Sequence, residues 1–260
     1  MAATDYVRLR QICLATSNIR KAEATLSTIL GLKVCHRARL PQFGLENIMF
    51  AVNSVFLEIV APVEAGTAVD RFLTRNHGRG GYMAIFDCAD VAKHRALATA
   101  AGIDAIFERK GEKAELLQLN PRQTGATMME FDHHYGGDDL FGAYGWAGED
   151  WQDFIDTGTT RDILGIEISS PKAGLRAALW AGLCDRPVSV GEPGIAEIRL
   201  DYGTITFRQT DNTPAELLRA IDLTVIDRRQ MLRAAEKAGL AVSDSSFDCC
   251  GVEFRLYGVA

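Results

Sequence analysis

Residues 9–31 read LRQICLATSNIRKAEATLSTILG, and this stretch decides the fold. Its first eight residues form an apolar, strand-like run, after which Ser17 or Asn18 offers a helix N-cap. The apolar positions that follow are spaced as on one face of a helix, and Gly31 ends that helix. Three strand-length runs come next, at 32–39, 45–52 and 55–61. The pattern therefore predicts one β-α-β-β-β module.

The same pattern begins again at 81–88, 163–169 and 220–225. Asp90 and Asp227 offer N-caps to the second and fourth helices, and Ser170 with Pro171 is expected to start the third. Short helices are also expected at 67–76 and 213–218. Repeated supersecondary units indicate duplication. We therefore predict an α+β fold of four βαβββ modules, taken as two pairs that form two curved mixed sheets.

The predicted domain organisation follows this order along the chain. Residues 1–134 form the first module pair with the candidate cavity, and residues 162–260 form a second, degenerate pair. Residues 135–161 between them are rich in Gly and Asp and carry Trp146 and Trp151. Long segments of this kind are either packed connectors or lids over a cavity, and both interpretations stay open.

Composition narrows the class of function. The net charge is −6 and the basic residues are interleaved with acidic ones, which argues against a nucleic-acid partner. No apolar run approaches a membrane span, and the first residues do not resemble a signal peptide, so we expect a cytoplasmic protein. Six scattered cysteines fit a reducing compartment. Cys249 and Cys250 are adjacent, and adjacent cysteines can bind soft metals or oxidise. The leading interpretation is that both are ordinary buried residues of a strand.

Two carboxylates stand out because each lies in the middle of an apolar strand. Glu58 lies in VFLEIV and Glu130 in TMMEF, each in the last strand of its module. A carboxylate in such a place is costly unless it is paired, bound to metal or hydrated. Each is therefore expected to face either water or a polar cavity.

The arrangement resembles the vicinal oxygen chelate superfamily, which includes glyoxalase, bleomycin resistance proteins and extradiol dioxygenases. Members place one metal ligand on the first and one on the last strand of each module around a shared cavity. Gln11, Glu58 and Glu130 fall on three of the four positions, and Met83 stands where a histidine is common. A thioether is a poor ligand for hard divalent ions. The resemblance therefore implies either no cofactor or a weakly bound Mg²⁺, Mn²⁺ or Zn²⁺.

Without metal, two glutamates in one cavity would differ in protonation and act as acid and base. We expect their carboxylates to share the cavity at about 5 to 9 Å from each other. Glutathione is not expected as a substrate, because Ala15 and Pro62 stand where the family carries an arginine and an asparagine.

Further site residues are weaker candidates. His134, directly after the Glu130 strand, is a candidate proton shuttle, against the alternative of a surface pair with His133. Arg122 lies on a turn and is a candidate for binding a substrate carboxylate, against a solvated turn. With Gln11, Phe56 and Met83 it completes the predicted substrate-binding set.

The leading functional hypothesis is a lyase or isomerase, a hydratase included, that transfers a proton next to a carbonyl of a small organic acid or aromatic catabolite. Glu58 and Glu130 would be its base and acid. The alternative is a binding protein of the same superfamily that sequesters a small molecule without chemistry. In either case the expected partner is a small molecule, with no membrane, and the candidate assembly is a homodimer.

Overall fold

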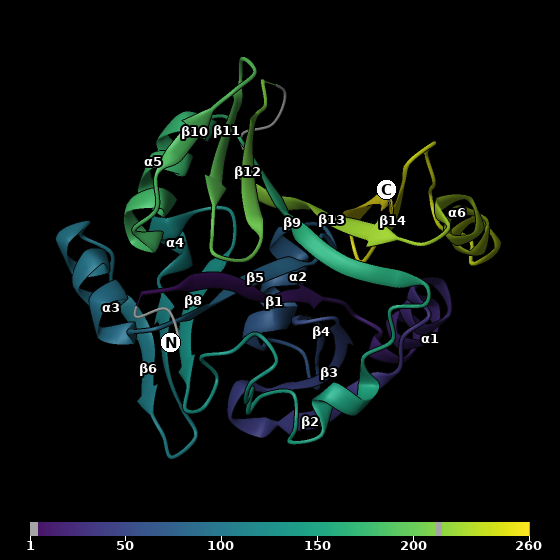
Figure 1. Ribbon diagram of the computed structural model, residues 1–260, viewed down its shortest axis with the longest axis horizontal. Coiled ribbons are helices and arrows are strands. Elements are labelled where there is room, and N and C mark those ends of the chain that lie inside the picture. The colour runs from purple at the N-terminus through teal and green to yellow at the C-terminus, as the bar shows by residue number, and fades with distance from the viewer. Residues whose placement is uncertain (1–4, 212–214, 260) are drawn as a thin grey trace. The chain divides into compact units, whose positions relative to one another are not determined.

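The computed structural model describes residues 5–211 and 215–259. The fold is α+β with two mixed, curved sheets (Figure 1), so the predicted fold class is confirmed. The strand orders are β2-β3-β4-β1-β5-β8-β7-β6 and β10-β11-β12-β9-β13-β15-β14. The first sheet contains the strands of the first two modules, and the second sheet contains those of the third and fourth.

The first two modules follow the predicted order of elements. Module one comprises β1 (Val7–Ala15), α1 (Ile19–Leu30), β2 (Val34–Leu40), β3 (Leu45–Val52) and β4 (Val55–Pro62). Helix α2 (Ala68–Arg75), where a short helix was expected, precedes module two. Module two comprises β5 (Gly81–Cys88), α3 (Val91–Ala100), β6 (Ala105–Lys110), β7 (Ala114–Leu119), the one-turn helix α4 (Pro121–Thr124) and β8 (Met128–His134).

Module three follows the predicted β-α-β-β-β order, whereas module four departs from it. A 3-10 turn at Trp151–Phe154 lies in the connecting segment, and another occurs at Pro41–Phe43. Module three comprises β9 (Thr160–Ser170), α5 (Ala173–Cys184), β10 (Val188–Val190), β11 (Ile195–Arg199) and β12 (Thr204–Gln209). Module four comprises β13 (Leu217–Val225), α6 (Arg228–Lys237), β14 (Ser246–Cys249) and β15 (Val252–Gly258). After its helix, the described part of module four has two strands where three were expected.

Local chemistry explains where the helices begin and end. The Asn18 side chain accepts a hydrogen bond from Lys21 N at 3.0 Å, and Gly31 takes the left-handed conformation at φ +71°, as expected. The helix of module three starts later than predicted. Helix α5 begins at Ala173, two residues after Pro171, and the Ser170 hydroxyl accepts a hydrogen bond from Lys172 N. The proline lies in the turn that leads into this helix.

The expected helix at 213–218 lies partly outside the described residues. Within the described part, Leu217 and Leu218 already belong to strand β13, so the helix prediction is wrong there. Both residues are apolar and lead directly into the run 220–225, so the strand extends three residues further back than the sequence pattern indicated.

The contacts of the chain group it into two compact units. Unit 1 comprises Met1–Arg10, Met83–Gly145 and Gly165–Arg219; unit 2 comprises Gln11–Tyr82, Trp146–Leu164 and Ala220–Ala260. Each unit therefore combines one module from each half of the sequence. The predicted boundaries at 134 and 162 follow chain order instead, and they stay a prediction.

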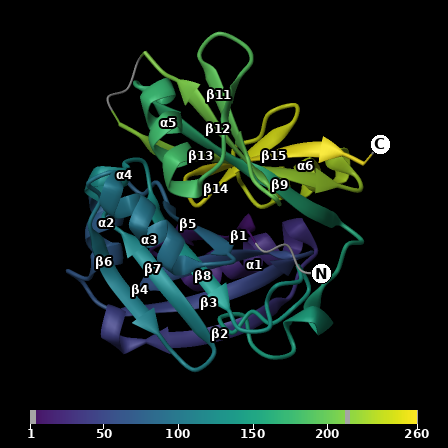
Figure 2. The same ribbon diagram turned by 60° about the vertical axis from the view of Figure 1, so that its left-hand side comes forward.

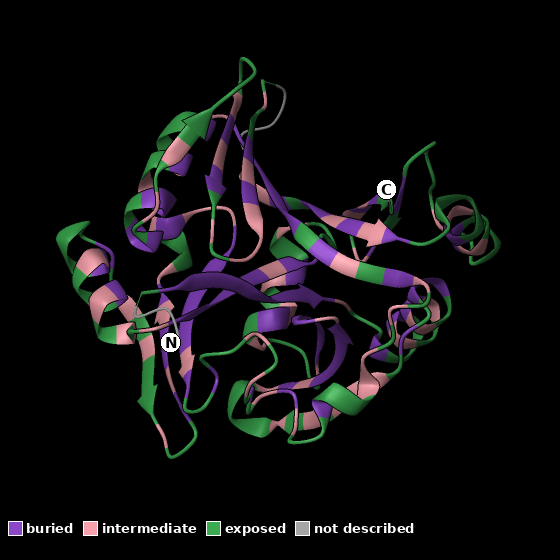
Figure 3. Ribbon diagram, in the orientation of Figure 1, coloured by how far each residue is buried: buried purple, intermediate pink, exposed green. Residues whose placement is uncertain are grey.

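Helices join the modules within each unit. In unit 1, α3 and α4 pack against α5 (Figure 2), and the indole of Trp180 donates a hydrogen bond to Thr124 O at 3.0 Å. In unit 2, α1 packs against α6. Strand β1 is buried along its whole length (Figure 3), as an interior strand of an apolar sheet should be.

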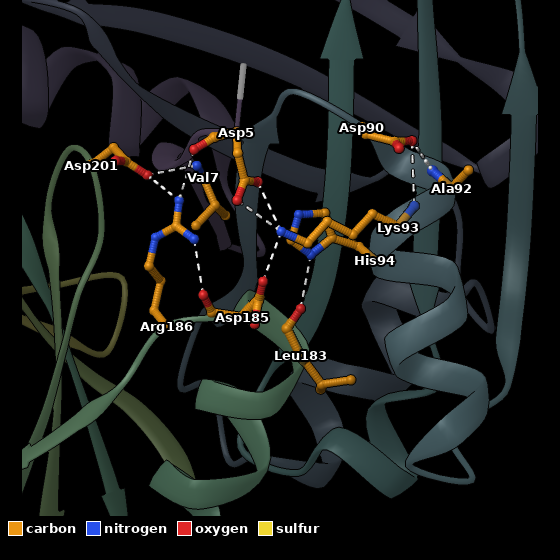
Figure 4. A network of polar contacts seen from close by, with 10 residues as sticks. All are labelled: Asp5, Val7, Asp90, Ala92, Lys93, His94, Leu183, Asp185, Arg186 and Asp201. Atoms are coloured by element: carbon orange, nitrogen blue, oxygen red, sulfur yellow. Dashed lines mark hydrogen bonds and ion pairs between the residues drawn. The ribbon is translucent and has the colours of Figure 1, made fainter. Parts of the chain in front are cut away.

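A network of ion pairs lies at the N-terminal edge of unit 1 (Figure 4). The Lys93 ammonium lies 2.8 Å from Asp5 Oδ1 and 2.7 Å from Asp185 Oδ2, so it joins the chain start, α3 and the end of α5. The Arg186 guanidinium lies 2.5 Å from Asp201 Oδ2. These groups remain partly exposed, so the network positions three segments without forming a buried charge centre.

No helix in the described residues is long and apolar enough to cross a membrane.

Candidate functional site

Glu58 is the centre of a buried polar cluster in unit 2. It lies on β4, which pairs in parallel with β1 and antiparallel with β3, and 8% of its surface is exposed. Gln11 Nε2 donates to Glu58 Oε2 at 2.8 Å, and Asn47 Nδ2 donates to Glu58 Oε1 at 2.6 Å. Both carboxylate oxygens therefore accept a hydrogen bond from a side-chain amide, one from each neighbouring strand.

The direction of the Asn47 amide is fixed by its second hydrogen bond. Its Oδ1 accepts from Ala38 N at 3.1 Å, so its NH₂ group points to Glu58. Asn47 was not among the residues predicted from the sequence. Its lateral position on β3 depends on the strand register, and the sequence pattern of one strand does not give that register.

An aromatic pair lies beside this carboxylate. Phe56 is two residues before Glu58 and therefore on the same face of β4, and it is fully buried. The Trp151 ring meets it edge to face, with ring centroids 4.9 Å apart. The second part of the connecting segment thus covers apolar surface next to the carboxylate.

Glu130 has a related environment in unit 1. It lies on β8 with 5% of its surface exposed, and Gln118 Nε2 on β7 donates to its Oε2 at 2.6 Å. Gln118 is its direct partner across the β7–β8 ladder and is also absent from the predicted set. Met83 is buried opposite Met128 in the β5–β8 pairing, and the direction of its side chain toward a cavity stays a prediction.

Glu58 and Glu130 belong to different units. Each is buried, carries an amide partner from the neighbouring strand and lies in the last strand of its module. The shared cavity and the separation of 5 to 9 Å stay predictions.

A second set of buried charges in unit 1 was missed by the sequence analysis. Arg8 donates to Asp87 Oδ2, to Gly137 O at 2.8 Å and to Asp138 O at 3.1 Å. Arg10 donates to Leu140 O at 2.6 Å. These two arginines of β1 therefore bind the backbone of the segment that follows β8. Burial raises the pKa of the Asp87 carboxyl, and the positive charges of both arginines oppose that rise.

His134 belongs to this buried region and is 1% exposed, so the alternative of a surface histidine pair is wrong for it. Its Nδ1 accepts a hydrogen bond from Gly145 N at 3.0 Å, and its Nε2 lies 3.7 Å from Asp132 Oδ2. Burial lowers the pKa of this imidazole to about 4. His134 is therefore neutral at pH 7, and its role as a proton shuttle stays a prediction.

Arg122 is exposed on α4, where its backbone N–H donates to the Asn120 side chain at 3.1 Å. The site residues predicted from the sequence thus divide by location. Gln11, Glu58 and Phe56 lie together in unit 2, whereas Met83, Arg122, Glu130 and His134 belong to unit 1. The proposed role of Arg122 in substrate binding stays a prediction.

The donor set around Glu58 does not fit a divalent cation. The amides of Gln11 and Asn47 present N–H groups to both carboxylate oxygens, whereas a cation requires oxygen lone pairs from the same groups. The described residues also contain no cluster of three or more His, Cys, Asp or Glu able to hold a metal. We therefore derive no chemical step through a metal.

Two glutamates of the second sheet have a different environment. Glu167 lies 2.8 Å from Arg208, and Glu253 lies 3.1 Å from Arg255 and also accepts from Ser246. Both are therefore neutralised by arginine. Glu58 is instead bound at both oxygens by the neutral amides of Gln11 and Asn47.

Comparisons with known proteins support the fold. No family model matches the sequence. A hypothetical protein from Staphylococcus aureus has a similar structure, with a TM-score of 0.70 and 10% identity, covering 97% of this chain and 99% of that one. The uncharacterized protein YqjC of Bacillus subtilis (strain 168) is 25% identical over 126 residues, which is 47% of this chain and 89% of that protein.

A methylmalonyl-CoA epimerase from Streptomyces coelicolor is also similar, with a TM-score of 0.45 and 20% identity, covering 50% of this chain and 98% of that one. A likeness of this extent carries no inference about activity. The similarity over nearly the whole chain to the Staphylococcus aureus protein shows the fold alone.

Proposed function

We propose that this protein transfers a proton next to a carbonyl group of a small molecule, with Glu58 as the base. The observation that carries the proposal is the geometry of Glu58: a buried carboxylate on an interior strand, bound at both oxygens by amide N–H groups at 2.6 and 2.8 Å. An ionised carboxylate has about four lone-pair positions. Two are used by the amides, so two remain to receive a proton from carbon.

The neighbouring residues assist that step in different ways. Gln11 and Asn47 are positioning residues, because they fix the carboxylate and do not themselves exchange protons. Phe56 and Trp151 provide an apolar surface on the same side of β4, which reduces the competition of water for the base. Glu130 is proposed as the acid that returns the proton, which requires that the two carboxylates share one cavity.

Proton transfer can be tested without knowing the physiological substrate. The protein is incubated in D₂O with a panel of 2-oxo acids, enolisable aromatic acids and 2-methyl acyl thioesters, and deuterium uptake at carbon is followed by mass spectrometry. For a compound that exchanges, Glu58→Gln should reduce the rate by about 10²- to 10⁴-fold, the usual contribution of a general base. Glu46→Gln, on the same hairpin, is the matched control and should keep the wild-type rate.

The outcomes separate the roles of the two glutamates. A folded Glu58→Gln variant with undiminished exchange would remove the proposed base. Loss in Glu58→Gln but not in Glu130→Gln would retain the base and remove Glu130 as the acid. Exchange that a chelator abolishes and added Mg²⁺, Mn²⁺ or Zn²⁺ restores would contradict the metal-free step.

A binding protein without chemistry is the second candidate, because a carboxylate held at both oxygens by neutral amides, beside apolar side chains, also suits recognition of a ligand. In that case a compound from the panel should raise the melting temperature without taking up deuterium. The homodimer and the cytoplasmic location stay predictions.

A further inference from the structure

The adjacent cysteines of module four occupy a tight hairpin in unit 2, separate from the Glu58 cluster. Cys249 ends β14 and pairs with Val252 of β15, so Cys250 and Gly251 form a two-residue turn. Their φ angles are +53° and +69°. Positive φ at both positions is the requirement of a type I′ turn, for which Asn-Gly is the usual sequence. Cysteine at the first position is therefore conformationally disfavoured and needs another explanation.

The backbone of this turn is held by neighbouring segments. Gly80 N donates to Cys250 O at 2.8 Å, and Ala15 N donates to Gly80 O at 2.7 Å. A Cβ placed on Gly251 would lie 2.6 Å from the Cα of Arg79, so only glycine fits there. The backbone that carries both cysteines is thus held in place by neighbouring segments.

The two thiols face each other. Their Sγ atoms are 3.9 Å apart, so a hydrogen bond joins the two thiols, and either one can be its donor. Two sulfur atoms are therefore held close together at one turn, whose backbone is bound by neighbouring segments.

The distance between the sulfurs distinguishes two uses of such a pair. With metal–sulfur bonds of about 2.3 Å and tetrahedral angles, two thiolates on one ion lie roughly 3.8 Å apart. A disulfide would bring the sulfurs to about 2.0 Å and usually spans a Cα separation of at least about 4.4 Å, whereas adjacent Cα atoms are only about 3.8 Å apart, so a disulfide here would be strained. The observed 3.9 Å matches the first arrangement and is far from the second.

We propose that Cys249 and Cys250 form a two-thiolate chelating site for a soft, thiophilic metal cation. Two metal–sulfur bonds form as two thiol protons pass to solvent, and no electrons are transferred. Cys250 is only half-buried and Gly251 is exposed, so the ion can approach from the turn, and water completes its coordination.

The test uses Cd²⁺ as the probe, with the full chain kept reduced. Titration should show one Cd²⁺ per chain with thiolate-to-metal absorption in the near ultraviolet, and bound Cd²⁺ should protect Cys249 and Cys250 from alkylation in peptide mapping. Cys250→Asn is the decisive variant, because asparagine is favoured in this turn and preserves the fold. It should lower the affinity by at least about tenfold, as should Cys249→Ser, by loss of one of two thiolates. Cys35→Ser is the matched control and should bind as the wild type does.

Three results would overturn the proposal. In the first, the folded wild type binds no Cd²⁺. In the second, the Cys250→Asn variant binds Cd²⁺ as well as the wild type does, which would mean an adventitious ion only. In the third, the cysteines that Cd²⁺ protects lie outside positions 249 and 250. None of these results depends on catalysis, so they test the metal site separately from the proposed proton transfer.

Discussion

The stability of the protein should fall in mild acid, and His134 should be a main cause. Its folded pKa is about 4, against the ordinary value of 6.5. Between these two values the unfolded chain binds a proton that the folded chain does not. The stabilising effect of neutral His134 is therefore complete above pH 6.5 and is lost as the pH falls toward 4.

The magnitude follows from the two pKa values. At about 1.36 kcal/mol per pH unit, His134 alone should make the protein roughly 3 kcal/mol less stable at pH 4 than at pH 7. The structural reason is specific. Protonation would place a hydrogen on Nδ1, which faces the N–H of Gly145, and would bring a positive charge toward Arg10. The nearby Asp87 carboxylate offsets only part of this cost.

The measurement is urea unfolding from pH 7 to pH 4 for the wild type and for His134→Gln. The variant should lose most of the pH dependence in this window, whatever its stability at pH 7. His94, whose pKa is also lowered by burial, contributes equally to both proteins and cancels in the difference. His77→Asn, at an exposed position with φ +53°, is the control and should follow the wild type. If the free energy of unfolding of His134→Gln depends on pH as strongly as that of the wild type, protonation of His134 is not the cause of the loss.

Three further predictions concern stability. Arg8→Met should cost about 3–5 kcal/mol in urea unfolding, because it leaves Asp87 buried without its partner, and replacing both should recover part of the loss. Trp151→Ala should cost about 3–5 kcal/mol, because it removes a fully buried ring that packs on Phe56; a loss below 1 kcal/mol would mean that the ring is not buried in solution. Lys93→Met should cost less than about 1 kcal/mol, and 1 M salt should reduce that cost, since its ion pairs are partly exposed; a salt-independent loss would contradict this.

Features that depend on neighbours in sequence could be predicted. The Asn18 cap and the Gly31 end of α1 follow from short-range patterns, and the structure contains both. The start of α5 could not be placed, because Pro171 is compatible both with a first helical turn and with the turn before it.

Features that depend on partners far along the chain could not be predicted. Arg8 and Asp87 are 79 residues apart, and nothing in the apolar strand around Arg8 indicates which carboxylate meets it. Asn47 and Gln118 were missed for the same reason: their contacts with the glutamates depend on strand register and lateral pairing. Glu58, Glu130 and the amide of Gln11 could be identified from the sequence, but the amides of Asn47 and Gln118 could not.

The composition of the two units has a consequence for synthesis on the ribosome. Every segment of unit 1 has been made once Arg219 has left the ribosome, whereas unit 2 still lacks Ala220–Ala260. Until Arg228–Lys237 has also emerged, helix α1 has no α6 to pack against, although α1 precedes α6 in the chain. Module one therefore lacks its packing partner until module four has been made. A pause or premature stop near residue 219 would leave the apolar surface of module one exposed to chaperones or to aggregation.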